Sequence, residues 1–230
     1  LTPRGLASLY FADRLFQLPL GLAASAMGIV LLPRISRALR AGDEAALNAA
    51  RGESFHFAAL LILPAATALY LLAGPIISVL FERGAFSAAD SQATSANLRI
   101  LALALPAFVL AKIILPEFLA EERMRVPLFA AFLACLVNVA SVLGLRATSE
   151  TLAPVMGVAI GAWFYASLLM VLARNRLRLG IAALRGLLGA MFATIGMGIA
   201  LVVLTGWMTP WLDPSQGFLI KGSALIALCL

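Results

Sequence analysis

The stretch SLYFADRLFQLPLGLAASAMGIVLLPRISRALR, residues 8–40, gives the clearest indication of what kind of protein this is. Residues 9–32 are mostly apolar and form a run longer than the about 20 residues that a helix needs to cross a bilayer. Asp13, Arg14 and Gln17 interrupt the first half of this run. A charge inside a spanning helix costs roughly 2.5–3.5 kcal/mol on insertion scales, so such residues usually face protein or a water-filled cavity.

The small and polar residues of this helix fall on one stripe at about 100° per residue. The stripe consists of Arg14, Gln17, Gly21, Ser25 and Gly28. One interpretation is that the helix lines a polar cavity headed by the guanidinium group. The other is that Arg14, only about five residues or roughly 7 Å inside the run, extends its side chain to the lipid headgroups. The residues alone leave both interpretations open.

The composition is that of an integral membrane protein. Hydrophobic residues make up 63% of the 230 residues and charged residues 12%, and the mean hydropathy is +1.01. A soluble domain is nearer about half apolar and about a quarter charged. The net charge of +6 would point to nucleic acid in a soluble protein, but cytoplasmic loops of membrane proteins collect Lys and Arg. No nucleic-acid partner is therefore expected.

The predicted fold class is an all-α, polytopic helical bundle that forms one transmembrane domain over residues 1–230. We expect about seven spans, the last of them truncated. Their approximate ranges are 9–32, 55–81, 98–119, 126–145, 151–173, 187–208 and 218–230. Because the chain begins at Leu1 and stops inside an apolar run, we expect a fragment of a longer protein.

Basic residues gather after the first, third and fifth predicted spans. They include Arg34, Arg37, Arg40, Arg51, Arg123, Arg125, Arg174, Arg176 and Arg178. The positive-inside rule places these segments in the cytoplasm and the head of the first span toward the outer half of the membrane. Two local patterns add detail: Ser87 is a predicted N-cap, and Gly157 with Gly161 forms a small-xxx-small pair that predicts close helix contact.

Two charged residues lie within the third predicted span. Lys112 is about eight residues from the cytoplasmic end, so its ammonium group either reaches the headgroups or faces a cavity. Glu117 is nearer that end and is expected to be solvated. If Arg14 and Lys112 face a cavity, they suit an anionic substrate, because the planar fork of an arginine matches phosphate oxygens.

Motifs for enzymatic chemistry are missing from the sequence. It has no G-x-x-x-x-G-K-[ST] phosphate loop. The single histidine, His56, begins an apolar span, where a packed or solvated role is expected, and Cys135 and Cys229 lack the spacing of a metal site. No His/Cys cluster or carboxylate pair within a span suggests metal or nucleophilic chemistry. The residues therefore offer no candidate for a catalytic, metal-binding or cofactor-binding site, and none is predicted.

Four blocks of the sequence resemble a known family. They are FADRLFQLPLG at residues 11–21, LLPRISR at 31–37, LFERGAFSAADS at 80–91 and LPAFVLAKIILPEF at 105–118. In order and spacing they resemble the MurJ (MviN) lipid II flippases, which belong to a superfamily of multidrug and polysaccharide-lipid exporters. The likeness covers nearly all of residues 8–178.

The resemblance implies a bacterial cytoplasmic-membrane transporter of about fourteen spans, with two lobes around a central cavity. This chain would supply most of the second lobe and the extra C-terminal spans, and its partners would be the missing N-terminal lobe, membrane lipids and a lipid-linked anionic substrate. The implied activity is translocation of lipid II, the lipid-linked peptidoglycan precursor, by alternating access. The resemblance makes Arg14 a pyrophosphate-facing cavity residue with Asp13 as its neighbour, and we add Gln17 and Lys112 to the candidate cavity site. Gln17 departs from the carboxylate found there in some members.

Other functions remain possible on the sequence alone. The first is export of another polyprenyl-pyrophosphate-linked glycan by a transporter of the same superfamily. The second is a membrane enzyme acting on polyprenyl phosphates, whose acid or histidine cluster would lie outside this chain. The third is a helical fragment with only a structural role.

Overall fold

A computed structural model describes residues 3–26, 32–84, 86–120, 122–147, 149–174 and 181–208. Within these ranges the chain is helical and has no strand. The helices are α1 (Pro3–Ala26), α2 (Leu32–Ala41), α3 (Glu44–Leu71), α4 (Ala73–Phe81), α5 (Ala88–Ala120), α6 (Arg125–Leu145), α7 (Ala153–Ala173) and α8 (Ile181–Met208). The predicted last span, 218–230, lies outside the described residues, as do residues 27–31 of the first.

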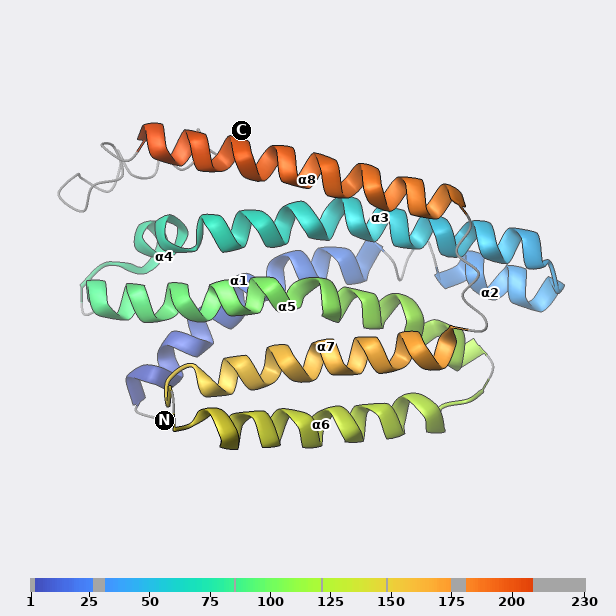
Figure 1. Ribbon diagram of the computed structural model, residues 1–230, viewed down its shortest axis with the longest axis horizontal. Helices are drawn as coiled ribbons and strands as arrows, with labels where there is room; N and C mark the ends of the chain where they lie inside the picture. The colour runs from blue at the N-terminus through green and yellow to red at the C-terminus, as the bar shows by residue number, and fades with distance from the viewer. Residues whose placement is uncertain are drawn as a thin grey trace.

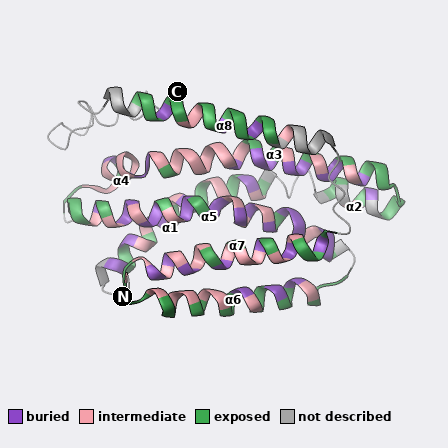
Figure 2. Cartoon of the chain, viewed as in Figure 1, coloured by how far each residue is buried: buried purple, intermediate pink, exposed green. Residues whose placement is uncertain are grey.

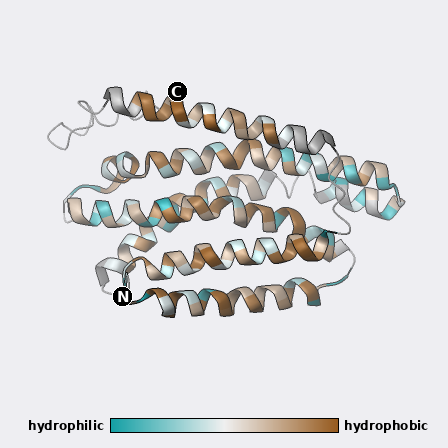
Figure 3. Cartoon of the chain, in the orientation of Figure 1, coloured by the Kyte–Doolittle hydropathy of each residue, from teal (hydrophilic) through white to brown (hydrophobic). Residues whose placement is uncertain are grey.

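Four of the described helices, α3, α5, α6 and α7, are long and apolar enough to cross a membrane. Helix α8 contains a shorter apolar segment, Leu188–Leu204, and α1 is not among the four. Apolar residues fill the middle of the long helices, whereas hydrophilic ones gather at α2 and the start of α3 (Figure 3). Helix α6 leaves a row of large apolar side chains exposed: Leu128, Phe129, Phe132, Leu136, Val139 and Leu143. Such a face suits lipid rather than water, and the predicted all-α membrane bundle is confirmed.

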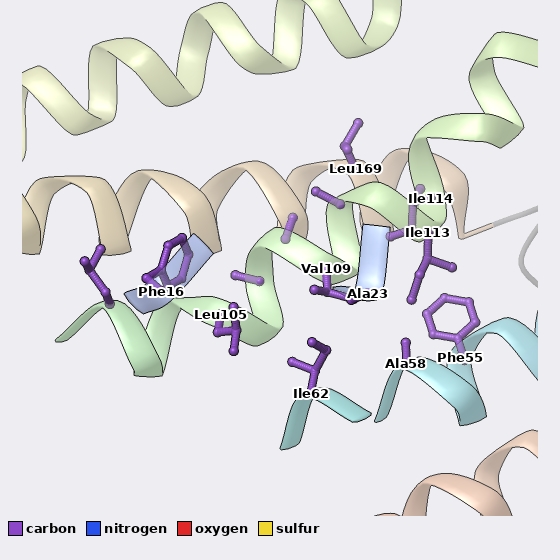
Figure 4. Close-up of a cluster of buried hydrophobic side chains, with 14 of the residues drawn as sticks. Phe16, Ala23, Phe55, Ala58, Ile62, Leu105, Val109, Ile113, Ile114 and Leu169 are labelled. Carbon is purple, nitrogen blue, oxygen red and sulfur yellow. The ribbon is translucent and has the colours of Figure 1, made fainter. Parts of the chain in front are cut away.

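Helix α5 is the centre of the bundle. It packs against α1, α3, α4 and α7, while α6 packs on α7 and α8 on α3 (Figure 1). Buried residues follow α5 along its length, as the purple segments of Figure 2 show. The core brings together Phe16 of α1, Ile62 of α3, Leu105 and Val109 of α5, and Leu169 of α7 (Figure 4). Helix α1, which carries Asp13, Arg14 and Gln17, is thus packed against α5, which carries Lys112.

The second predicted span, 55–81, corresponds to the end of α3 together with α4. Helix α3 begins earlier, at Glu44, because Asp43 caps it by accepting a hydrogen bond from the Ala46 N–H at 2.9 Å. The helix ends at Leu71, because Pro75 in the first turn of α4 has no N–H for the residue 71 carbonyl and its ring crowds that group. Pro64 lies inside α3 without ending it.

The arginine-rich segments share one end of the bundle. Helix α2, the α5–α6 turn and the C-terminal end of α7 lie together there, opposite the α4–α5 and α6–α7 turns (Figure 1). These segments carry Arg34, Arg37, Arg40, Arg123 and Arg174. The positive-inside rule predicts that this end is cytoplasmic.

Both local predictions are confirmed. Ser87 and Asp90 form a reciprocal cap at the start of α5, with Asp90 accepting from the Ser87 N–H at 3.0 Å and Ser87 Oγ accepting from the Asp90 N–H at 3.3 Å. On α7, a Cβ at Gly161 would lie 3.1 Å from Asn138 Cβ of α6, and one at Gly157 would lie 3.1 Å from the Asn138 carbonyl oxygen. Only residues without a side chain allow α6 and α7 to approach this closely.

Candidate polar stripe of the first helix

The polar stripe of α1 lies on the surface of the bundle. Ala12, Phe16 and Ala23 are buried against the core, whereas the stripe residues Arg14, Gln17, Gly21 and Ser25 are all exposed. The two sets fall on opposite sides of the helix at about 100° per residue. The predicted stripe therefore points away from α5, and its last member, Gly28, lies outside the described residues.

Arg14 is held over the ring of Tyr10, one turn earlier on the same helix. Its guanidinium carbon lies 4.8 Å from the Tyr10 ring centroid, and Nη2 donates a hydrogen bond to the Tyr10 hydroxyl at 3.0 Å. A cation over an aromatic face gains about 0.5–1 kcal/mol at an exposed site. Asp13 meanwhile accepts a hydrogen bond from the Gln17 amide. Arg14 thus pairs with Tyr10, and Gln17 pairs with Asp13, each four residues earlier on the helix. Asp13 and Arg14 do not pair with each other here.

Three further contacts fix the head of α1 in position. The Phe11 ring lies 4.8 Å from that of Phe81 and 5.6 Å from that of Phe86, centroid to centroid. Asn97 of α5, which is buried, donates to Ser8 Oγ at 3.1 Å. The FADR block at residues 11–14 and the FERGAF block at residues 81–86 therefore pack against each other through their phenylalanines.

Lys112 lies on α5 at a different level from Arg14. Helices α1 and α5 run in the same direction, since Ser8 meets Asn97 and Phe16 meets Phe108 at a ring distance of 5.3 Å. Lys112 is one turn beyond Phe108, and this register places it about 10 Å further along the bundle than Arg14. Its side chain is exposed and makes no hydrogen bond or ion pair within the described ranges. The structure does not bring the two cations together.

The expectation that Glu117 is solvated is wrong. Its carboxylate is 4% exposed and accepts two hydrogen bonds from Arg51 of α3, which is 6% exposed, at 2.7 Å from Nε and 2.5 Å from Nη2. Arg51 also donates to Asn48 Oδ1 at 3.3 Å. Burial of either charge alone would be costly, so the pair must be understood as one structural unit.

Sequence reasoning missed three contacts that shape this region: Tyr10 with Arg14, Arg51 with Glu117, and Asn97 with Ser8. The spacing of Tyr10 to Arg14 is a helical i, i+4 signal that could have been read directly. No sequence pattern links Arg51 to Glu117 or Asn97 to Ser8, because each pair joins different helices. No group of three or more His, Cys, Asp or Glu residues that could hold a metal occurs in the described part of the chain.

Comparisons with known proteins identify the family of the chain. The family model for the lipid II flippase MurJ matches residues 1–221. A probable lipid II flippase MurJ of Rhizobium meliloti (strain 1021) is 36% identical over 204 residues, covering 88% of this chain and 38% of the relative. One from Rhizobium tropici is 44% identical over 133 residues, covering 58% of this chain and 25% of the relative.

A solved structure of a lipid II flippase MurJ in an inward closed conformation has the same fold. It matches with a TM-score of 0.78 at 21% sequence identity, over 97% of this chain and 45% of that one. The chain thus spans less than half the length of the relatives it matches. With its several apolar spans it is a multi-pass membrane protein, and the family match over nearly its whole length shows that it belongs to the MurJ lipid II flippase family.

Proposed function

We propose that the protein containing this chain translocates lipid II across the bacterial cytoplasmic membrane by alternating access, as a transporter and not an enzyme. In this proposal the chain supplies most of the second lobe of a two-lobed transporter. The relatives it matches are named lipid II flippases, and the chain spans less than half of their length. The remaining length would provide the N-terminal lobe and the other half of the cavity.

The observation that carries the proposal is the position of the polar stripe on α1. A helix whose polar residues face away from its own bundle needs water or another protein surface on that side, because hydrocarbon cannot satisfy them. An opposing lobe across a water-filled cavity meets this need. The exposed Arg14, Gln17, Gly21 and Ser25 would then line the cavity.

The cations of this surface suit a pyrophosphate-linked substrate. Arg14 presents a guanidinium whose planar fork can bind two phosphate oxygens at once. Asp13 and Gln17, which are hydrogen-bonded to each other, would form a polar surface beside Arg14. Lys112, on the same side of α5 as the residues that meet α1, would add a second positive charge deeper along the transport path.

The test uses the full-length protein in bacteria depleted of their own lipid II flippase. The proposal predicts that the protein restores growth and that Arg14→Ala abolishes the rescue at an unchanged membrane level. Arg146→Ala is the matched control, since Arg146 is an exposed arginine in the α6–α7 turn and should leave rescue intact. A well-expressed protein that fails to rescue would contradict lipid II as the substrate and favour another polyprenyl-linked glycan. Rescue by Arg14→Ala would remove that residue from the site.

A further inference from the structure

A groove on the far side of α5 from α1 is the strongest site outside the polar stripe. It is an apolar pocket of about 130 Å³ between α3, α5 and α7. Helix α5 forms its floor with Pro106, Val109, Leu110 and Ile113, and Trp163 of α7 lines one wall. Asn97 and Phe108, which meet α1, lie on the opposite side of α5 at about 100° per residue. The groove is thus separate from the proposed transport surface.

A single arginine stands on the same stripe of α5 as the groove. Arg99, Leu103, Pro106 and Leu110 are spaced by four, three and four residues and so share one helix face. Arg99 is exposed and makes no hydrogen bond or ion pair with any described residue. Leu103, between Arg99 and the pocket, is 57% exposed. An apolar surface therefore leads continuously from a free guanidinium into the pocket.

Tyr70 of α3 lies at the same level as Arg99. Helices α3 and α5 are antiparallel, with their register fixed by Arg51 and Glu117. Tyr70 lies about 28 Å from that pair along α3, and Arg99 about 27 Å from it along α5. Tyr70 is 40% exposed and lies two helical turns beyond Leu63, which lines the pocket. The phenol and the guanidinium thus lie at one level, about 10 Å beyond Pro106 along α5, and we call this level the mouth of the groove.

The wall that Trp163 of α7 forms is held by a hydrogen bond to α5, close to a proline inside that helix. The Trp163 indole N–H donates to the Leu103 carbonyl at 3.1 Å, close to Pro106, which cannot continue the backbone ladder of α5. This bond fixes the indole beside the pocket and satisfies its only polar atom. The body of the groove then presents apolar surface alone.

We infer that this groove binds an anionic phospholipid, with its phosphate at Arg99 and an acyl chain along Leu103, Pro106 and Leu110. Arg99 lies about 16 Å along α5 from Leu110, which is close to the about 15 Å thickness of the hydrocarbon of one leaflet. The mouth lies toward the end of the bundle opposite the arginine-rich segments, so the positive-inside rule assigns the lipid to the outer leaflet. The charge complementarity of an unpaired guanidinium selects a negatively charged headgroup.

Native mass spectrometry of the full-length protein titrated with phosphatidylglycerol tests this inference. Arg99→Gln should weaken the tightest phosphatidylglycerol binding by about fivefold or more, since one arginine near a lipid surface contributes about 1 kcal/mol. Arg146→Gln should leave that binding unchanged, and phosphatidylcholine, whose choline offsets the charge of its phosphate, should lose less affinity than phosphatidylglycerol with Arg99→Gln. Unchanged phosphatidylglycerol binding by Arg99→Gln would overturn the inference.

A second variant tests the chain-binding part of the groove. Leu110→Trp fills the pocket from its floor and should lower binding of both phospholipids while leaving the melting temperature near that of the unmodified protein. Normal binding by a folded Leu110→Trp variant would show that protein, rather than an acyl chain, covers the groove. Binding of a polyprenyl phosphate, but not phosphatidylglycerol, through Arg99 would also contradict the assignment.

Discussion

Arg51 on α3 and Glu117 on α5, 66 residues apart in sequence, form a two-pronged ion pair that is almost fully buried at the arginine-rich end of the bundle. Arg34 and Glu53 form a second pair at a similar 2.7 Å, but their side chains are 48% and 56% exposed. Both are arginine–glutamate pairs, and they differ in burial. Comparing them therefore shows how burial changes the contribution of such a pair to the free energy of unfolding.

We predict that Glu117→Ala lowers the free energy of unfolding by about 3–5 kcal/mol, because it leaves the Arg51 charge buried without its partner. Glu53→Ala should cost less than about 1 kcal/mol, since exposed pairs contribute little. Thermal or denaturant unfolding of the full-length protein in detergent measures both. Equal losses for the two variants would contradict the structural role of the buried pair.

Replacing both buried charges should recover most of the loss. The double variant Arg51→Leu with Glu117→Leu removes the charge that a single substitution strands, and apolar replacement of a buried pair is often neutral or stabilising. We expect the double variant to be more stable than Glu117→Ala alone. If the double variant instead loses more unfolding free energy than Glu117→Ala, Arg51 must be stabilised by other partners more than by Glu117.

Gly157 gives a prediction about the contact between α6 and α7. A Cβ at this position would collide with Val142 of α6, so Gly157→Ala should destabilise the protein by about 1–3 kcal/mol through overpacking. Gly189→Ala on α8 is the control, because nothing lies within 4 Å of the added atom. Its melting temperature should be unchanged or slightly raised, owing to the higher helix propensity of alanine. A harmless Gly157→Ala would show that the two helices can separate freely.

The geometry at Arg14 predicts that lysine is an incomplete replacement. Arg14→Lys keeps the positive charge and a cation for the Tyr10 ring but loses the planar fork. We expect Arg14→Lys to rescue flippase-depleted cells only in part, with a plating efficiency between those of the unmodified protein and Arg14→Ala. Tyr10→Phe keeps the ring and should rescue normally. Full rescue by Arg14→Lys would mean that charge alone is needed.

Local periodicity predicted the parts of the structure that depend on one helix. The exposed stripe from Arg14 to Ser25 follows from helical spacing, and the cap at Ser87 follows from its side chain. Glu117 was placed in water because its position near a span end gave no sign of Arg51, which reaches it from another helix. The division of the second span at Leu72 was missed because a long apolar run hid the effect of Pro75 on the preceding carbonyl. Neither the ion pair of Glu117 nor the groove below Arg99 could be predicted from the sequence, because both form only where α3 packs against α5.

The central claim is that the stripe of α1 faces a water-filled cavity, and cysteine accessibility in the full-length protein tests it most directly. Cys135, Cys229 and any other native cysteines would first be replaced by serine, and Gln17→Cys, Ser25→Cys and the buried Ala23→Cys tested separately with a membrane-impermeant thiosulfonate. We predict that cysteines at 17 and 25 react, that the cysteine at 23 does not, and that all three react after denaturation. Unreactive cysteines at 17 and 25 in the folded protein would place the stripe against lipid or packed protein and contradict the account.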